Sequence, residues 1–219
     1  MKHVARTVVI ALALIALSGC VDVVQYISGD GAAIDVYLRL TLQKGAFELA
    51  NSFSDEPQDM EETFDQEFGL NESEVVADFP FGIEPEYAPI NSEFEYGFEL
   101  RYSAPRSVLG QEPEGEAGFV PFIDAEGVRI PFADQEGSVM GEDGEGEGDD
   151  EFANAFLGGS RYRLMLSKRL VSRVSEARLV TPSDSREVLV TEFPDVWMVE
   201  FPTSLWLNAE SGTYLDVRF

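Results

Sequence analysis

The chain has 219 residues, of which 44% are hydrophobic and 26% are charged. This is enough for a domain with a substantial core, and the chain is too apolar for global disorder. Its 41 acidic residues outnumber 15 Lys and Arg, giving a formal net charge of −26. Affinity for nucleic acid depends mostly on attraction between cationic side chains and phosphates. We therefore expect no nucleic-acid partner.

The amino terminus has the layout of a signal peptide. Lys2 and Arg6 precede an apolar run at 8–17. This run is too short to span a bilayer, which takes about 20 apolar residues, but it is typical of a signal peptide. The run leads into four residues that resemble the lipobox of bacterial lipoproteins: Leu17, Ser18, Gly19 and Cys20. The resemblance implies removal of residues 1–19 and attachment of lipid to the Cys20 thiol.

Loss of the signal peptide would remove His3, the only histidine, and lipid would occupy the only thiol. The mature chain would then have no Cys or His nucleophile, no disulfide and no metal site built from His or Cys. We expect a protein anchored to the bacterial cell membrane through the lipid on Cys20 and located outside the cytoplasm. The residue directly after the lipidated cysteine is Val21 and not aspartate. This is compatible with sorting to the outer membrane in a bacterium that has two membranes.

Hydrophobic periodicity organises the mature chain. We expect a lipidated tether at 20–33 and a single domain at 34–219. Apolar residues alternate with polar ones from Ile34 to Leu42 and again from Phe94 to Tyr102, which predicts two strands. Further runs typical of strands follow at 162–170, 174–181, 187–193, 196–201 and 214–218.

Helical spacing of apolar residues predicts amphipathic helices at 46–53 and 60–68, and capping residues suggest a short third helix between Asn71 and Pro80. A hairpin is predicted from Phe119–Ile123 and Val128–Phe132. Pro121 and Pro131 lack backbone donors and therefore place both arms at sheet edges.

Residues 134–151 hold nine acidic residues and five glycines. This composition cannot bury enough apolar surface to offset the entropy of ordering, so we expect a flexible acidic loop. The predicted fold class is α+β, with a largely antiparallel sheet and two or three amphipathic helices after its first strand. Short connections favour pairing of sequential strands over parallel crossovers.

The acidic loop contains the best metal candidate. Asp143, Glu145 and Glu147 resemble the first ligand positions of an EF-hand calcium loop, but the twelfth position is Asn154 rather than the bidentate glutamate. The alternative is a solvated acidic run that attracts cations diffusely. We predict no cofactor.

No sequence motif of a serine hydrolase or a nucleotide-binding enzyme is present. A glycosidase that uses only carboxylates remains an alternative, because among 41 acidic residues some pair has a suitable spacing by chance. We predict a non-enzymatic protein with no catalytic residues.

Cationic residues cluster at 161–178. Arg161, Arg163 and Arg169 share one face of the strand predicted there, which suggests contact with anionic lipid headgroups. The alternative is neutralisation by the acidic residues of 55–151. Trp197 and Phe201 share a face of another predicted strand, where core packing competes with ligand stacking as their role.

The segment from the lipobox onward contains Cys20-Val21-Asp22-Val23, then Ser28-Gly29-Asp30-Gly31, then the predicted strand from Ile34 to Leu38. This series of motifs resembles the amino-terminal pattern of LppM-like bacterial lipoproteins. The resemblance implies an α+β domain with a suspected lipid-binding role. We expect a lipid-anchored, non-enzymatic envelope protein that binds an apolar or amphipathic ligand such as a lipid. The alternative is an envelope interaction protein that binds another protein through its acidic surface.

Overall fold

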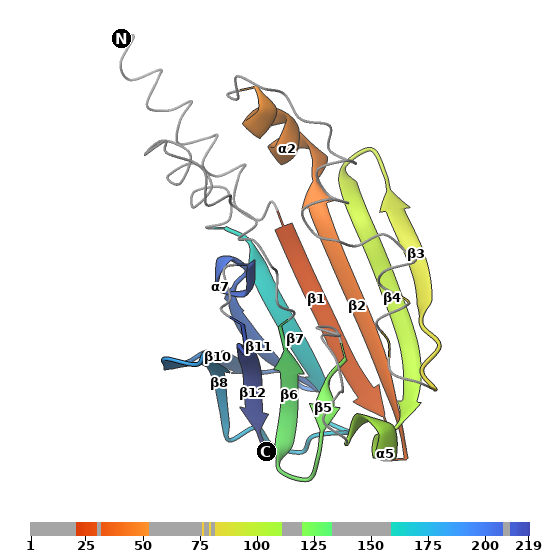
Figure 1. Cartoon of the computed structure of the whole chain (residues 1–219), viewed down its shortest axis with the longest axis vertical. Helices are drawn as coiled ribbons and strands as arrows, with labels where there is room; N and C mark the ends of the chain where they lie inside the picture. The colour runs from red at the N-terminus through yellow and green to blue at the C-terminus, as the bar shows by residue number, and fades with distance from the viewer. Residues whose placement is uncertain are drawn as a thin grey trace.

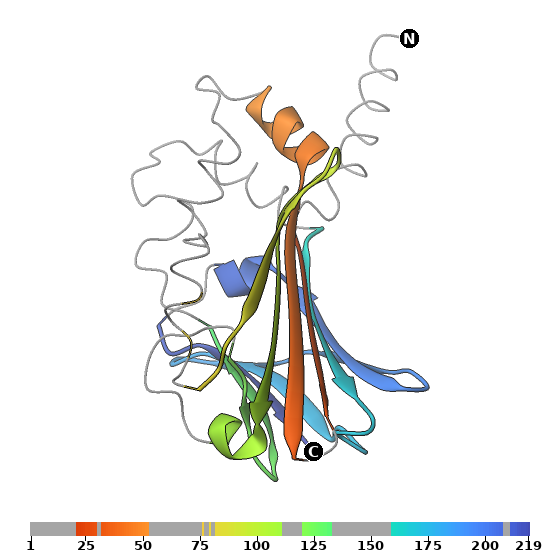
Figure 2. The same cartoon turned by 90° about the vertical axis from the view of Figure 1, so that its right-hand side faces the viewer.

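The computed structural model describes residues 21–29, 32–52, 76, 79, 82–110, 120–132, 159–207 and 211–219. These residues form two β-sheets that share one hydrophobic core (Figure 1). In the view of Figure 2, the small sheet lies against one face of the large sheet, toward the end away from helix α2 (Lys44–Asn51).

The large sheet has seven strands in the order β10-β11-β7-β1-β2-β4-β3. Their bounds are β1 Val21–Gly29, β2 Ala33–Gln43, β3 Glu86–Asn91, β4 Glu95–Pro105, β7 Arg161–Ser167, β10 Leu189–Glu192 and β11 Val196–Pro202. Strands β1 and β7 pair in parallel, whereas the other neighbours in this sheet are antiparallel. The sequence-based preference for sequential antiparallel pairing therefore fails at the centre of the sheet.

The small sheet has five antiparallel strands in the order β5-β6-β12-β8-β9. Their bounds are β5 Phe122–Ile123, β6 Gly127–Pro131, β8 Glu176–Val180, β9 Ser185–Glu187 and β12 Tyr214–Arg218. The chain passes from β9 in the small sheet to β10 in the large sheet. Between these strands, the Val188 N–H donates to the carbonyl of Ala177 in β8 at 3.0 Å.

The core lies between the sheets. Alternation in β2 turns Ile34, Val36, Leu38 and Leu40 inward, and each is at most 3% exposed. Phe132 follows β6 and packs against the large sheet, with its ring centroid 5.9 Å from that of Tyr162 and 6.0 Å from that of Phe201. Burial of one such side chain contributes about 1.5–3 kcal/mol, so the shared core stabilises both sheets.

The fold is mostly β, and the predicted α+β class is wrong. The described helices are short: α2, α5 (Arg106–Leu109) and α7 (Ser204–Leu207). Helix α2 confirms the helix predicted to begin near residue 46. The second layer of the core is a sheet because five of the strands after residue 120, namely β5, β6, β12, β8 and β9, pair with one another and cover the inner face of the large sheet.

The predicted tether at 20–33 contains strand β1 instead. Val21, Val23, Gln25 and Ile27 are buried, while the residues between them face outward. A polar residue at the buried third position and Val24 on the outer face obscure this alternation in the sequence. The described part of the domain therefore includes Val21–Gly29, upstream of residue 34.

The hairpin predicted around Asp124 is present as β5 and β6, and the Asp124 carboxylate accepts N–H bonds from Glu126 and Gly127. Strand β6 is not an edge strand, because β12 pairs with its other side. Pro131 is tolerated there as the last residue of the strand, where the hydrogen-bond ladder ends. The helices predicted at 60–68 and 71–80 and the acidic loop at 134–151 lie outside the described residues, apart from Val76 and Phe79.

Candidate functional site

The outer face of the large sheet, opposite the core, carries an ordered row of side chains. Strand register aligns one residue from each of six neighbouring strands, from β11 to β3. We call this set the outer row: Met198, Met165, Tyr26, Tyr37, Arg101 and Glu86. The row thus begins with two methionines and two tyrosines and ends with two exposed charged side chains of opposite sign. This order makes the row amphipathic along its length.

A second, polar row lies beside the outer row, farther from Val21. Ser28 of β1 pairs with Asp35 of β2, which pairs with Ser103 of β4. Two hydroxyls therefore flank one carboxylate on the outer face. These groups supply both donors and acceptors to a molecule lying across the sheet.

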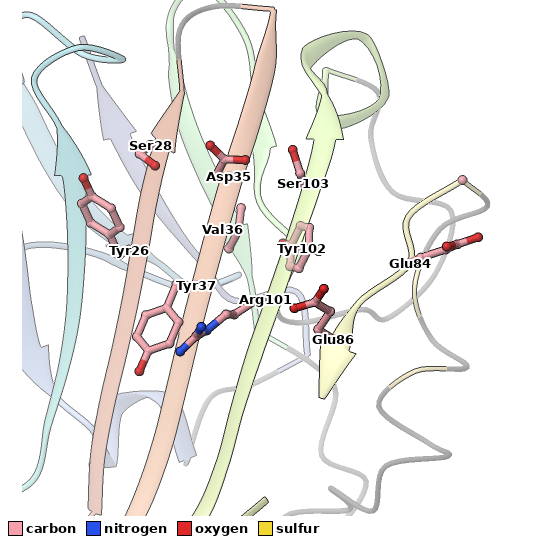
Figure 3. Close-up of a pocket in the computed structure, with 11 residues that line it drawn as sticks. Tyr26, Ser28, Asp35, Val36, Tyr37, Glu84, Glu86, Arg101, Tyr102 and Ser103 are labelled. Atoms are coloured by element: carbon pink, nitrogen blue, oxygen red, sulfur yellow. The ribbon is translucent and has the colours of Figure 1, made fainter. Parts of the chain in front are cut away.

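The polar row and the outer row from Tyr26 to Glu86 line a groove made of two adjoining hollows. The hollows share Tyr26, Ser28 and Asp35, and the two methionines of the outer row lie outside them. The first hollow, of about 620 Å³, continues over Tyr37, Arg101 and Ser103 (Figure 3). The second, of about 700 Å³, continues toward the turn after β7. We call the pair of hollows the distal groove, because it lies at the end of β1 farthest from Val21.

Tyr37 is held in a fixed position in the distal groove. Its hydroxyl donates to Glu99 Oε1 at 2.9 Å, and the Arg101 guanidinium lies 5.3 Å from the centre of its ring. Arg101 also donates to Glu99 Oε2 at 2.8 Å, so one carboxylate orients both side chains. Partial burial, followed by the hydrogen bond to Glu99, raises the pKa of Tyr37. The phenol, which is protonated at neutral pH even at the ordinary value of 10.0, therefore keeps its proton to a higher pH than a free tyrosine.

Cations border the second hollow. Lys168 Nζ donates to Glu192 Oε1 at 2.6 Å and lies 5.1 Å from the centre of the Trp197 ring. The next residue, Arg169, lies in the turn after β7, where its side chain is exposed. Asp195 lines the same hollow. The distal groove thus offers charges of both signs at both of its ends.

The structure separates the three arginines predicted to contact headgroups. Arg161 and Arg163 share the outer face of β7, whereas Arg169 is beyond the strand and lines the distal groove. Arg163 pairs with Asp22 and, at 2.9 Å, with Glu200 Oε2. Arg163 is therefore neutralised, as in the alternative interpretation, but its partners lie outside the acidic segment 55–151 that this interpretation named.

Phe201 packs in the core, where its ring stacks on that of Tyr162 at 4.9 Å between centroids. Trp197 is partly buried against the same core. The lipobox residues, Cys20 and the calcium candidates Asp143, Glu145 and Glu147 lie outside the described residues. Within the described residues, no group of three Asp, Glu, His or Cys side chains is placed to hold a metal ion.

Tyr26, Ser28 and Tyr37 were not identified from the sequence as site residues. The first two lie in the segment interpreted as a tether, and Tyr37 is an outward residue of a correctly predicted strand. Two tyrosines at outward positions of neighbouring strands were the available signal. Strand pairing was needed to place them side by side.

No protein-family model, curated protein or solved structure matches this chain. In the part of the chain that the structure describes, no helix is long and apolar enough to cross a membrane.

Proposed function

We propose that the chain is a lipid-anchored, non-enzymatic binding protein of the bacterial cell envelope, and that it holds an amphipathic ligand in its distal groove. The observation that carries this proposal is the outer row. It runs from Met198 and Met165 through Tyr26 and Tyr37 to the exposed charges of Arg101 and Glu86.

Each part of the outer row suits one part of such a ligand. Methionine side chains adapt to irregular apolar shapes, and tyrosine rings offer flat apolar contact with a polar edge. Arg101 and the hydroxyls of Ser28 and Ser103 can bind a polar head. The inner aromatic residues Phe98, Tyr102 and Phe201 are buried in the core. The proposed ligand site is therefore on the outer face of the large sheet rather than between the sheets.

The described faces do not by themselves form an acidic surface for binding another protein. Among the described residues, 17 acidic and 13 basic side chains leave a net charge of −4, compared with −26 for the whole chain. Most of the described arginines on the sheets have acidic neighbours, such as Glu95 beside Arg39 at 2.6 Å. The described faces are thus close to neutral.

Binding is tested with a fluorescent lysophospholipid titrated into residues 21–219. We expect Tyr26→Ala to weaken binding at least tenfold, because Tyr26 lines both hollows of the groove. The matched control is Tyr214→Ala, at a tyrosine on the outer face of the small sheet, which should leave the affinity unchanged.

Equal affinity in both variants would contradict a ligand site in the distal groove. A chain that binds no lipid but captures one envelope protein in a salt-sensitive way would favour the interaction protein. Turnover of cell-wall glycans that is lost with a single Asp or Glu substitution would contradict the non-enzymatic assignment.

A further inference from the structure

The residue that would carry the lipid directly precedes a central strand. Val21, the first residue of β1, is 1% exposed, and its N–H donates to Ser160 Oγ at 2.9 Å. Consecutive Cα atoms lie about 3.8 Å apart, so Cys20 cannot be far from the end of the sheet. An anchor at this position has no linker to hold the domain away from the membrane.

The same end of the sheet presents an exposed aromatic residue. Register places Val21 beside Leu42, Leu42 beside Tyr96, and Tyr96 beside Asn91, so the turn between β3 and β4 lies at the end where β1 begins. Phe94 lies in this turn with 69% of its surface exposed. Two strand spacings separate β1 from β4, a distance of about 10 Å.

The turn is braced rather than free. The Lys44 N–H, at the start of α2, donates to the Phe94 carbonyl at 2.8 Å, and Lys44 Nζ donates to Asn91 Oδ1 at 2.6 Å. Ser92 Oγ accepts the N–H groups of Phe94 and Glu95. The Phe94 ring is therefore presented from a fixed backbone, which lowers the entropy that its insertion into a membrane would cost.

We propose that the end of the large sheet formed by Val21, the α2 start and the β3–β4 turn docks on the lipid bilayer, with Phe94 inserted at its interface. This proposal rests on the proposed lipidation of Cys20. The diacylglycerol that the lipobox implies on Cys20 carries two acyl chains, which are sufficient for stable attachment. Phe94 therefore does not hold the protein at the membrane. It sets which end of the domain faces the bilayer, because the anchor keeps this ring at a high effective concentration beside the interface.

The contact is apolar rather than electrostatic. Charges of both signs lie at this end of the sheet. Lys44 and Glu48 belong to α2, Glu93 precedes Phe94, Arg161 begins β7, and all four are exposed or partly exposed. Docking should therefore occur on uncharged phosphatidylcholine and should not need anionic lipid.

The test places an environment-sensitive dye on the lipidated full chain, where the native thiol is occupied. Glu93→Cys puts the dye beside Phe94, and Ala125→Cys puts it in the β5–β6 turn at the opposite end. The opposite position follows from Arg106, which joins the carbonyls of Ala32 and Asp124. Both positions are exposed, so neither substitution should disturb the core.

On phosphatidylcholine vesicles we expect the dye at position 93 to brighten severalfold and to be quenched by lipids with a spin label near the headgroup. The dye at position 125 should keep its aqueous spectrum. When Phe94→Asp is added to Glu93→Cys, the dye at position 93 should regain its aqueous spectrum while the protein still floats with the vesicles.

If the protein floats with the vesicles but the dye at position 93 keeps its aqueous spectrum, the docking proposal is wrong and the proposed anchor still holds. Burial of both dyes, or of the dye at 125 alone, would also overturn it. A protein that does not float and whose Cys20 has no added lipid mass would overturn the anchor, and the docking with it.

Discussion

At the residue scale, the least expected feature of the core is a pair of polar side chains between the sheets. Gln25 is 1% exposed, and its Oε1 accepts a hydrogen bond from the hydroxyl of Tyr162, which is 3% exposed. A buried acceptor that loses its donor costs about 1–3 kcal/mol. The bond therefore contributes to stability mainly through the penalty that would follow its loss.

We predict that Tyr162→Phe lowers the free energy of unfolding by about 1–3 kcal/mol, measured by urea denaturation, because the ring packing is kept while the Gln25 oxygen loses this donor. Tyr214→Phe is the control, at a half-buried tyrosine on the outer face of the small sheet, and should change stability by less than about 0.5 kcal/mol. Equal losses would mean that the hydrogen bond is not the cause.

The buried tyrosines also predict the response to alkali. Burial raises the pKa of both Tyr102 and Tyr162 above the ordinary value of 10.0. In the unfolded chain these phenols ionise near pH 10, whereas in the folded chain they stay protonated. The contribution of these two protonated phenols to the free energy of unfolding is therefore fully present below pH 10 and is lost as the pH rises above 10.

We therefore expect the urea midpoint to fall as the pH rises above 10, and the last tyrosines to ionise only as the protein unfolds. Absorbance of the phenolate followed together with circular dichroism checks this prediction. Complete ionisation of all tyrosines in a protein that keeps its native circular dichroism would contradict it.

At the element scale, one glycine allows β2 and β4 to pair closely. Gly97 has a φ of +154°, and a Cβ atom built there would lie 2.0 Å from the Leu40 carbonyl oxygen. Neither the backbone angle nor the space accommodates a side chain. A strand of eleven residues thus depends on a residue with no side chain near its start.

We predict that Gly97→Ala lowers the free energy of unfolding by about 3 kcal/mol, because β4 must shift away from β2. The matched control is Gly45→Ala in α2, where nothing lies within 4 Å of the new Cβ, and it should be neutral or stabilise by about 0.5–1 kcal/mol. Thermal denaturation of both variants measures the difference, and a similar effect at both sites would refute the steric explanation.

Strands with strict alternation, such as β2 and β4, were predictable from the sequence, whereas β1 was not. β2 and β4 keep apolar residues on one face throughout, and both were predicted. β1 was missed because Gln25 is buried and Val24 faces outward, so the local pattern does not distinguish a strand from a tether.

The site could not be predicted, for a different reason. The outer row takes one residue from each of six strands, and each of these residues alone looks like an ordinary outward side chain. Its amphipathic character exists only after the strands are ordered. The strand order in turn depends on the β1–β7 pairing, which no local pattern encodes.

At the scale of the whole molecule, β1 lies at the centre of the large sheet. It pairs with β2 on one side and with β7 on the other, along most of its nine residues. A chain that begins at residue 34, the domain boundary that the sequence suggested, would leave β2 and β7 without this shared neighbour. The loss would also remove four buried side chains from the core.

We predict that residues 34–219 fail to fold, whereas residues 21–219 fold cooperatively. Urea denaturation followed by circular dichroism should give a sigmoidal transition for the longer chain and none for the shorter one. A cooperative transition of similar midpoint in both chains would show that β1 is dispensable.

The parallel pairing of β1 with β7 also sets an order of events during biosynthesis. The Val21 N–H binds Ser160, 139 residues later in the sequence. At a synthesis rate of 5–20 residues per second, this interval lasts on the order of 10 s. β2 can cover one edge of β1 at once, but the other edge stays open until β7 emerges, and an open edge is a template for aggregation. The nascent chain therefore exposes one unpaired edge of Val21–Gly29 throughout this interval, and we expect a chaperone that shields this strand to raise the yield of folded protein.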